Sequence, residues 1–360
     1  VWVAERMAHI LDNTPGRATT INGEEYLFFS GYNYLGINSD PEFLELLQQG
    51  LSRYGWIFPS SRISNTQLAL YRDCEALLAN LTGTEDALLL PSGFTAGRIA
   101  TGNRPILNAP GSHPAIFRDG VKQRTFAEWS DCLVSELNNG QFPEHGVASD
   151  SLSTLSATIY DFQFLDNISR RLTVVLDDSH GIGLTGVSGR GVSSMVPQKS
   201  NLDYVYSFSL SKAFGVAGGA ICCSKEAAAT FRSLPEYTAV TPPSPAQLYA
   251  FLHGKDIYVI NRIKLFNNIK FLAEMLHDLP GIHFDPRFPV FILNEIYAER
   301  LFFEERILIS SFAYPDPKGK KLNRIVVNAL HTREDLERLS ECLHRIYSSQ
   351  KNPCPITTNS

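Results

Sequence analysis

The chain has 360 residues, too many for one small domain and suited to a large domain with a smaller companion. Hydrophobic residues make up 44% and charged residues 19%, which is typical of a globular protein, and the net charge of −5 leaves no basic surplus for nucleic acid. The six cysteines lack the density and pairing of a disulfide scaffold, and there is neither an apolar run of about eighteen residues nor a signal-peptide pattern. We therefore expect a soluble, reduced, cytoplasmic protein without a membrane span.

Helical patterns follow a short mixed stretch at the start of the chain. Asn22-Gly23 predicts a turn between two short apolar pieces. Residues 41–55 predict a helix that begins at Pro41, with Ser39 or Asp40 as its cap. Residues 66–80 predict a second helix, because their apolar side chains recur at helical spacing.

Short apolar runs then alternate with helical segments. The runs cover residues 86–90, 171–178, 203–212 and 220–224. This alternation predicts an α/β fold in which a mostly parallel sheet lies between helices. In such sheets ligands bind beyond the carboxyl ends of the strands, and polar residues follow several of these runs.

The pattern changes after the proline-rich segment 241–245. Residues 246–279 predict one long helical stretch or two helices, and strand-like runs follow at 288–294, 305–311 and 323–331. Thr332 is the expected cap of a last helix. These elements predict a small α+β domain.

The chain is therefore divided into four parts. We expect an N-terminal arm at 1–36, a large domain at 37–255, a small C-terminal domain at 256–350, and a disordered tail at 351–360.

Lys212 is the first candidate for chemistry. It lies at the end of a predicted strand, among small residues, and glycines follow it, so a planar group has room beside its amine. Desolvation or nearby positive charge turns such an amine into a nucleophile that forms Schiff bases. The alternative is an ordinary surface lysine.

Acidic residues end a predicted buried strand at Asp177-Asp178, and Ser179-His180 follow. Buried acids are costly unless a cation or donor pairs with them, and a protonated pyridinium nitrogen is one such partner. A helix cap with a solvated acid is the plain alternative. No second His or acid has helical ligand spacing, so no metal site is predicted.

Other candidates are weaker taken singly. Ser92-Gly93-Phe94-Thr95, between a strand and a helix start, can bind phosphate through N–H groups and hydroxyls. His113 could stack on an aromatic ring, and Arg324 could bind a carboxylate with both nitrogens. In isolation each fits a structural role as well.

The order of these segments carries more information than any one of them. The sequence resembles the α-oxoamine synthases, fold-type I pyridoxal-phosphate enzymes that condense an amino acid with an acyl-CoA, from about Asn33 to Thr332. The matching segments are GYNYLGI, SSRISNT, LLLPSGFTA, SHPAI, VVLDDSHGIGLTG, GRGV, SFSLSKAFGVAGG and RIVVNALHT. DDSHGIG and SLSKAFG are the most specific of them.

The resemblance implies roles for particular residues. Lys212 would be the Schiff-base lysine and would remove the α-proton, and Asp177 would pair with the pyridinium nitrogen. His180 would bond the ring hydroxyl, and His113 would stack on the ring. The remaining implied residues are Ser92, Gly93, Phe94 and Ser209 for the phosphate, Thr238 for the phosphate of the other subunit, and Asn33 and Arg324 for the substrate carboxylate.

The resemblance further implies a homodimer with the active site at the subunit interface. One departure is WIFPSSR, which stands where the family has a glycine-rich stretch that helps admit the CoA arm. A pyridoxal-phosphate aminotransferase or lyase on the same fold remains an alternative, because a fold does not fix a reaction. A cofactor-binding regulatory subunit is a second alternative, against which the retained Lys212, Asp177 and His113 count.

Overall fold

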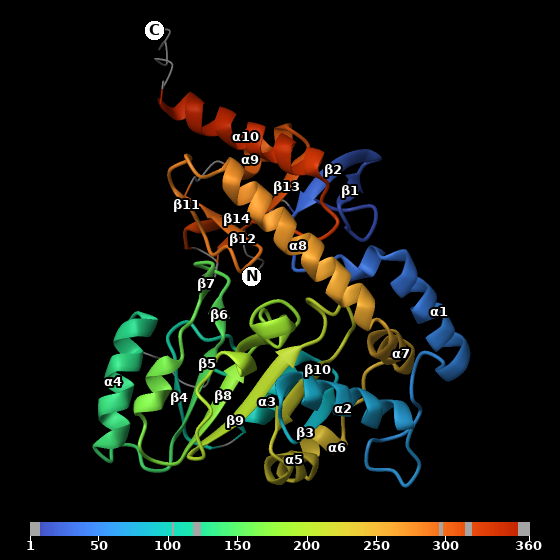
Figure 1. The fold of residues 1–360 in the computed structure, drawn as a ribbon. Helices are drawn as coiled ribbons and strands as arrows, with labels where there is room; N and C mark the ends of the chain where they lie inside the picture. The colour runs from blue at the N-terminus through green and yellow to red at the C-terminus, as the bar shows by residue number, and fades with distance from the viewer. Residues whose placement is uncertain (1–7, 103, 118–123, 295–297, 314–318, 352–360) are drawn as a thin grey trace, which may run out of the picture. The chain divides into compact units, whose positions relative to one another are not determined.

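The computed structural model describes residues 8–102, 104–117, 124–294, 298–313 and 319–351 (Figure 1). The chain forms two compact units. Unit 1 comprises residues 1–36, 155–157 and 263–360, and unit 2 comprises residues 37–154 and 158–262. The predicted tail lies almost entirely outside the described residues.

Unit 2 is built on a six-stranded sheet in the order β3-β10-β9-β8-β5-β4. Its strands are β3 (Asp86–Leu90), β4 (Ile106–Asn108), β5 (Gly146–Asp150), β8 (Leu172–Asp177), β9 (Leu202–Ser209) and β10 (Gly219–Cys223), and a small hairpin joins β6 (Leu152–Ser153) to β7 (Thr158–Ile159). Strands β4, β5, β8 and β9 run parallel, whereas β10 is antiparallel to both of its neighbours. A short glycine-rich connection between β9 and β10, without a crossover helix, accounts for this reversal.

The helices of unit 2 begin at the signals that the sequence carries. They are α1 (Pro41–Tyr54), α2 (Ala69–Thr82), α3 (Gly93–Thr101), α4 (Phe126–Asn138), α5 (Lys225–Arg232), α6 (Pro235–Thr238), α7 (Pro245–His253) and the first part of α8 (Lys255–Met275), with 3-10 turns at Ile37–Ser39, Gln163–Asn167, Val187–Gly189 and Gly191–Ser194. The Asp40 side chain accepts the N–H of Phe43 at the start of α1, as predicted. The second helix starts three residues later than expected, at Ala69.

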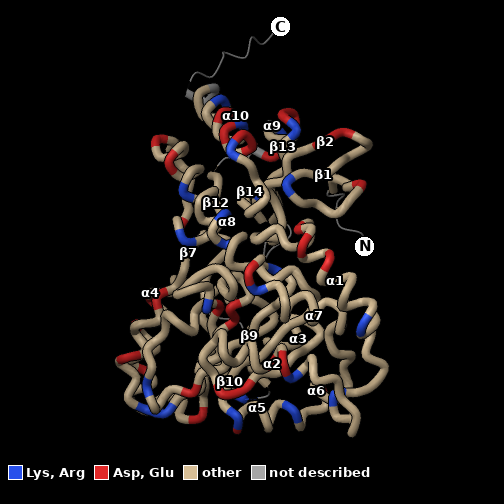
Figure 2. The backbone as a smooth tube through the Cα atoms, turned by 45° about the vertical axis from the view of Figure 1, so that its right-hand side comes forward, with Lys and Arg blue, Asp and Glu red and all other residues tan. Residues whose placement is uncertain are grey.

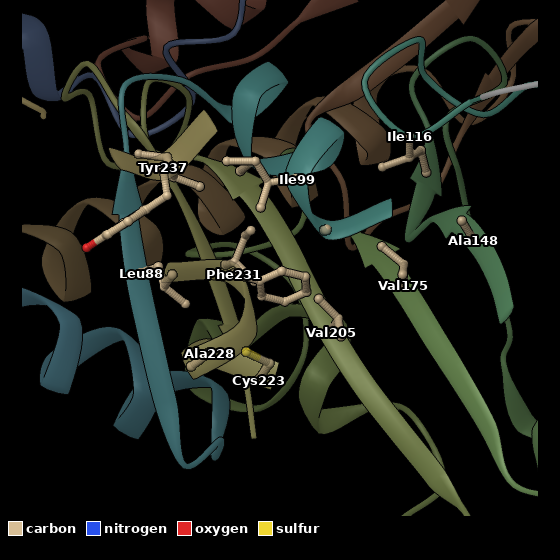
Figure 3. Close-up of a cluster of buried hydrophobic side chains, with 14 of the residues drawn as sticks. Leu88, Ile99, Ile116, Ala148, Val175, Val205, Cys223, Ala228, Phe231 and Tyr237 are labelled. Atoms are coloured by element: carbon tan, nitrogen blue, oxygen red, sulfur yellow. The ribbon is translucent and has the colours of Figure 1, made fainter. Parts of the chain in front are cut away.

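One hydrophobic cluster joins the sheet to α3, α5 and α6 (Figure 3). Val175, Val205 and Leu88 contribute from the strands, Ile99 from α3 and Phe231 from α5. These side chains are almost entirely buried. Because this core fixes α3 against β9 and β10, the first turn of α3 is held at the carboxyl edge of the sheet.

Unit 1 has its own six-stranded sheet, in the order β1-β2-β13-β14-β12-β11. Its elements are β1 (Ala18–Ile21), β2 (Glu24–Phe29), β11 (Ile282–Phe284), β12 (Val290–Leu293), β13 (Ile307–Ala313), β14 (Lys321–Val326), the rest of α8, α9 (Ala298–Glu304) and α10 (Arg333–Lys351). Asn22 and Gly23 both have positive φ, 51° and 77°, and form the predicted turn between β1 and β2. Thr332 accepts the N–H of Asp335 at the start of α10, again as predicted.

Two boundaries differ from those drawn on the sequence. The expected N-terminal arm is part of the unit 1 sheet, because β2 pairs in parallel with β13. The expected boundary at 255/256 lies where α8 begins, and α8 continues through it, so the units divide inside this helix, between Arg262 and Ile263. An unbroken helix gives no signal of a domain boundary in the sequence.

Charged residues of both signs are spread along the chain. Lys and Arg are interspersed with Asp and Glu along both units (Figure 2). Among the residues that the structure describes, no helix combines the length and apolar character that crossing a bilayer requires.

Candidate active site

The candidate site in unit 2 lies at the carboxyl edge of its sheet. Strand β8 ends at Asp177, β9 ends at Ser209 three residues before Lys212, and β5 ends at Asp150. These three strands are adjacent in the sheet. The polar ends of the strands therefore meet at one place, as the sequence predicted for Asp177 and Lys212.

The start of α3 packs directly against the end of β9. A Cβ atom on Gly93 would lie 2.6 Å from the Ser209 Cβ and 2.8 Å from its backbone nitrogen, so only glycine fits there. Ser92 caps the helix by accepting the Thr95 N–H at 3.1 Å, and the hydroxyls of these two residues lie 2.9 Å apart. The first N–H groups of α3 and the Ser209 hydroxyl are thus gathered at one point, which suits a phosphate group.

Asp177 is held by the turn that follows it. Its Oδ1 accepts the N–H of Ser179 at 2.9 Å, and the Ser179 hydroxyl accepts the N–H of Ser209 at 2.9 Å. Asp177 is only 6% exposed. These bonds join the ends of β8 and β9 and fix the Asp177 carboxylate at the carboxyl edge of the sheet.

Lys212 has the electrostatic character of a reactive amine. Desolvation lowers its pKa, while the negative charges of Asp177 and Asp150 oppose that shift. A lysine with a lowered pKa spends more time as the unprotonated amine, which is the nucleophilic and basic form.

His113 lies in the loop after β4 and is exposed. Its backbone N–H donates to Asp150 Oδ2 at 3.0 Å, and its ring Nδ1 accepts the N–H of Ala115 at 3.1 Å. Desolvation lowers the pKa of the ring, and the positive charge of Lys212 acts in the same direction. A neutral ring with Nδ1 as acceptor carries its proton on Nε2.

Asp178 serves the local fold. It is fully buried, and its Oδ2 accepts the Val192 N–H at 3.0 Å. Side chains on Gly181 or Gly191 would collide with its carboxyl group. Burial raises the pKa of Asp178 to about 7. The partly buried His180 follows in the same turn.

Phe94 and Thr238 occupy different surroundings in unit 2. Phe94, in the first turn of α3, is 54% exposed. Thr238 ends α6, where its hydroxyl donates to the Pro235 carbonyl at 3.2 Å and its own carbonyl accepts the Ser61 hydroxyl at 3.0 Å. The implied role of Thr238 concerns a second subunit and stays a prediction.

Asn33 and Arg324 belong to unit 1. Both amide atoms of the Asn33 side chain are buried and make no hydrogen bond with the residues that the structure describes. Arg324 lies over the Phe312 ring, 4.9 Å from its centroid, and desolvation lowers its pKa. The positive charge of Arg324 acts to lower the pKa of the buried Tyr34, although desolvation raises it overall. A desolvated guanidinium suits a carboxylate ligand.

The sequence did not single out Asp150. Its backbone pairs with Asp177 across β5 and β8, and its charge acts on Lys212. The available signal was the short apolar run VAS, which ends on an acid just as β8 does, but no recognised motif surrounds it.

Pyridoxal phosphate fits this set of residues. The tight approach of Gly93 to Ser209 leaves backbone N–H groups and hydroxyls for a phosphate, and the buried Asp177 offers a carboxylate for a ring nitrogen. The amine of Lys212 has the lowered pKa that covalent attachment to an aldehyde requires. Within the described ranges, no group of three or more His, Cys, Asp or Glu side chains forms a possible metal site.

Comparison with known proteins agrees with this assignment. Residues 127–343, more than half of the chain, match the family model described as aminotransferase class I and II. The chain belongs to this family. The resemblance to α-oxoamine synthases and the fold-type I architecture predicted from the motifs are confirmed.

Several curated relatives are 8-amino-7-oxononanoate synthases. That of Coprothermobacter proteolyticus is 28% identical over 351 residues, which cover 88% of this chain and 87% of the relative. That of Petrotoga mobilis is 27% identical and covers 91% and 90%. The biotin biosynthesis bifunctional protein BioWF of Corynebacterium kroppenstedtii is 25% identical, and the match spans about half of its length, 54%.

Solved structures show the same fold. A serine palmitoyltransferase of Sphingomonas wittichii has a TM-score of 0.81 at 19% identity and covers 97% of this chain and 94% of its own. An 8-amino-7-oxononanoate synthase of Francisella tularensis has a TM-score of 0.73 at 21% identity, covering 91% and 99%. A lysine-to-alanine variant of the serine palmitoyltransferase of S. paucimobilis, solved with a bound PLP–myriocin aldimine, has a TM-score of 0.81 at 17% identity and coverage of 96% and 92%. These matches show that the chain shares the fold of these proteins.

Proposed function

We propose that this protein is a pyridoxal-phosphate-dependent acyltransferase that condenses an amino acid with an acyl-CoA. The preferred reaction joins L-alanine to pimeloyl-CoA and yields 8-amino-7-oxononanoate, carbon dioxide and free CoA, a step of biotin synthesis. The observation that carries the proposal is the meeting of Lys212, Asp177 and the Gly93–Ser209 contact at one edge of the sheet. The names of several relatives support the choice of reaction.

The residues of unit 2 would hold the cofactor at its two ends. Ser92, Gly93, Phe94 and Ser209 would bind the phosphate through backbone N–H groups and hydroxyls, and Asp177 would lie against the ring nitrogen. His113 would cover one face of the ring and His180 would bond its hydroxyl. When bound, pyridoxal phosphate supplies an electron sink that stabilises negative charge on the α-carbon of the amino acid.

Lys212 has two tasks in this proposal. Its amine would hold the cofactor, and Nζ would accept the proton from the α-carbon of the bound amino acid. The lowered pKa of Lys212 supports both tasks, because each needs the unprotonated amine. Asp177 would keep the positive charge of the ring nitrogen in place by acting as its fixed counter-charge.

Arg324 and Asn33 of unit 1 would bind the carboxylate of the amino acid. A guanidinium makes two parallel hydrogen bonds to a carboxylate, and the buried Asn33 amide could add a donor. Orientation of the amino acid decides which bond at its α-carbon breaks, since the breaking bond must align with the π system of the cofactor.

Fewer residues are proposed to bind the acyl donor than to bind the amino acid, so the choice of acyl donor is more open. Acetyl-CoA with glycine, or palmitoyl-CoA with serine, would use the same residues, and the similarity to serine palmitoyltransferases keeps the second pair in view. Trp56, Ile57 and Phe58 occupy the segment where the family has glycines, and this bulk would narrow the space for a thioester. A pyridoxal-phosphate aminotransferase is the alternative outside this group.

We further propose a cytoplasmic homodimer whose active sites lie at the subunit interface. The loop between α1 and α2 exposes Trp56 at 54%, Ile57 at 59% and Ile63 at 64%, and burial of such side chains favours association. Ser61 in the same loop contacts Thr238, whose hydroxyl would complete the phosphate site of the partner. The few cysteines and the ordinary composition support the location.

The reaction is tested by measuring CoA release. L-alanine, glycine and L-serine are each combined with pimeloyl-, acetyl- and palmitoyl-CoA, and free thiol is followed for the wild type and for Lys212→Ala. The proposal predicts thiol release for one amino acid with one thioester and none for the variant. Exchange of amino groups with a keto acid, without thiol release from any pair, would replace it with the aminotransferase.

A further inference from the structure

Two carboxyl groups lie side by side at the edge of the unit 2 sheet. Strands β5 and β8 run parallel, and their register pairs Asp150 with Asp177. Residues paired across parallel strands project to the same face of the sheet. Neighbouring carboxyl groups in a desolvated place resist being ionised together, so one of the two tends to keep its proton.

Asp150 is the member of the pair that binds the loop containing His113. Its Oδ2 accepts the backbone N–H of His113 at 3.0 Å, and the ring Nδ1 of His113 accepts the Ala115 N–H at 3.1 Å. The carbonyl of His113 accepts the N–H of Ile116 at 3.0 Å, which closes the turn. Asp150 therefore fixes the backbone at the residue whose ring is predicted to face the cofactor.

The electrostatics agree with this division of roles. Burial and the charge of Asp177 raise the pKa of Asp150 well above its usual range, against the opposing effects of the His113 N–H and the charge of Lys212. Among the described residues, Asp177 from β8 and Lys212 beyond β9 act on Asp150. Asp150 acts in turn on Lys212 and on Tyr160, which follows β7.

We propose that Asp150 is a positioning residue of the cofactor site, which holds the His113 loop in place through its Oδ2 and leaves Asp177 to face the ring nitrogen. The role rests on the proposed function, because His113 and Asp177 are assigned through it. Oδ2 of a protonated Asp150 still accepts the His113 N–H, so the neutral acid performs the structural task without adding a second charge beside Lys212.

The test compares Asp150→Asn with Asp150→Ala. Asparagine is neutral and keeps an acceptor oxygen, whereas alanine removes it; Asp131→Asn, on an exposed residue of α4, is the matched control. We expect Asp150→Asn to bind pyridoxal phosphate within about threefold of the wild type and Asp150→Ala to bind it about tenfold more weakly, the cost of one lost hydrogen bond. We also expect KM for the amino acid to stay near the wild-type value in Asp150→Asn and to rise in Asp150→Ala, with a smaller change in kcat.

A pH titration of the visible band of the bound cofactor separates positioning from charge. If Asp150 is neutral, the midpoint for Asp150→Asn matches the wild type, whereas loss of an ionised neighbour would move it down by about one unit or more. A shifted midpoint, or an alanine variant that binds cofactor as tightly as the wild type, would overturn the proposal.

A third readout needs no cofactor. In the cofactor-free full chain, the ring resonances of His113 report which nitrogen carries the proton. We expect the wild type and Asp150→Asn to agree and Asp150→Ala to differ, and identical spectra for all three would overturn the proposal. A wild type that takes no pyridoxal phosphate at Lys212 would instead refute the proposed function, so the two failures are distinguishable.

Discussion

Two groups of charged side chains in unit 2 are balanced in different ways. The first, called here the ion-pair cluster, consists of Arg62, Glu75, Asp86 and Arg232. Arg62 donates to Glu75 at 3.0 Å, and Arg232 binds both oxygens of Asp86, at 2.6 and 3.0 Å. Arg62 also lies 4.4 Å from the centroid of the Tyr71 ring. Each cation in this cluster has an acid of its own.

The second group, called here the carboxyl-edge group, consists of Asp150, Asp177 and Lys212. Two acids lie on adjacent strands, and the nearby cation is a lysine whose pKa desolvation lowers. The pKa values of Asp86 in the first group and Asp150 in the second are shifted in opposite directions. A hydrogen bond from Arg232 is the main cause of the lowered pKa of Asp86, whereas burial raises that of Asp150.

We infer from this difference that the ion-pair cluster stabilises the fold and that the carboxyl-edge group binds a ligand. A buried pair completed by its own arginine is a structural feature, although burial still raises the pKa of Glu75 against the effect of Arg62. Like charges gathered beside a desolvated lysine are expensive unless a bound group uses them, and such clusters mark functional sites. The four predictions that follow test this distinction.

The largest effect is expected for Lys212→Ala. Turnover should fall by about a thousandfold or more, because the chain loses both the point of attachment and the base. Folding should be retained, since alanine removes an amine whose burial carries a desolvation cost. Steady-state thiol release measures the turnover, and circular dichroism measures the folding. Substantial activity would remove Lys212 from the mechanism.

Arg62→Ala should act on stability. It leaves Glu75 buried without its nearest cation, which costs about 3–5 kcal/mol of the free energy of unfolding. Urea denaturation measures the loss. Joint replacement of Arg62 by Met and Glu75 by Leu should recover most of it, since no buried charge is then left alone. An unchanged urea midpoint in the single variant would remove the ion-pair cluster from the account of stability.

Asp177→Asn should lower kcat by on the order of a hundredfold while cofactor still binds, because the ring nitrogen loses its charged partner and the phosphate contacts remain. Binding is followed by the visible absorbance of the cofactor and activity by thiol release. Equal losses of binding and turnover would show that Asp177 mainly holds the cofactor. Asp203→Asn, at an exposed ion pair with Arg171, is the control.

The smallest effect concerns pH and Asp178. Its pKa of about 7 in the folded protein exceeds that of an aspartate in the unfolded chain, about 3.9. The folded state therefore binds this proton more tightly, and the contribution of Asp178 to stability is complete below about pH 4 and lost as the pH rises through 7.

The Asn side chain of Asp178→Asn does not titrate, so the variant does not lose stability through this group as the pH rises. The unfolding free energy of the variant should gain roughly 1–4 kcal/mol relative to the wild type between pH 4 and pH 8. Urea denaturation at several pH values measures the difference. Parallel pH profiles for the two proteins would contradict the raised pKa of this carboxyl group.

The sequence located two candidate residues from local segments alone. DDSHGIG and SLSKAFG follow apolar runs, so Asp177 and Lys212 could be assigned to the carboxyl ends of strands without knowledge of the fold. Asp150 could not, because its importance comes from the pairing of β5 with β8, and no property of VASD specifies that pairing.

The same limit applies to the fold. Caps and turns are local, and the start of α1 at Asp40, the turn at Asn22-Gly23 and the start of α10 after Thr332 were all predicted. The pairing of β10 with β3 and the parallel pairing of β2 with β13 depend on contacts between distant segments. Sequence patterns specify which residues are extended and leave the choice of neighbour to the packing of the whole sheet.

The central claim is that Lys212 carries pyridoxal phosphate, and covalent mapping tests it most directly. The protein is incubated with pyridoxal phosphate, reduced with sodium borohydride and digested, and the modified peptide is identified by mass spectrometry. The account predicts one phosphopyridoxyl group, on Lys212, and none on Lys225 or Lys199 of the same unit. Modification of another lysine in preference to Lys212, or no stable modification, would contradict it.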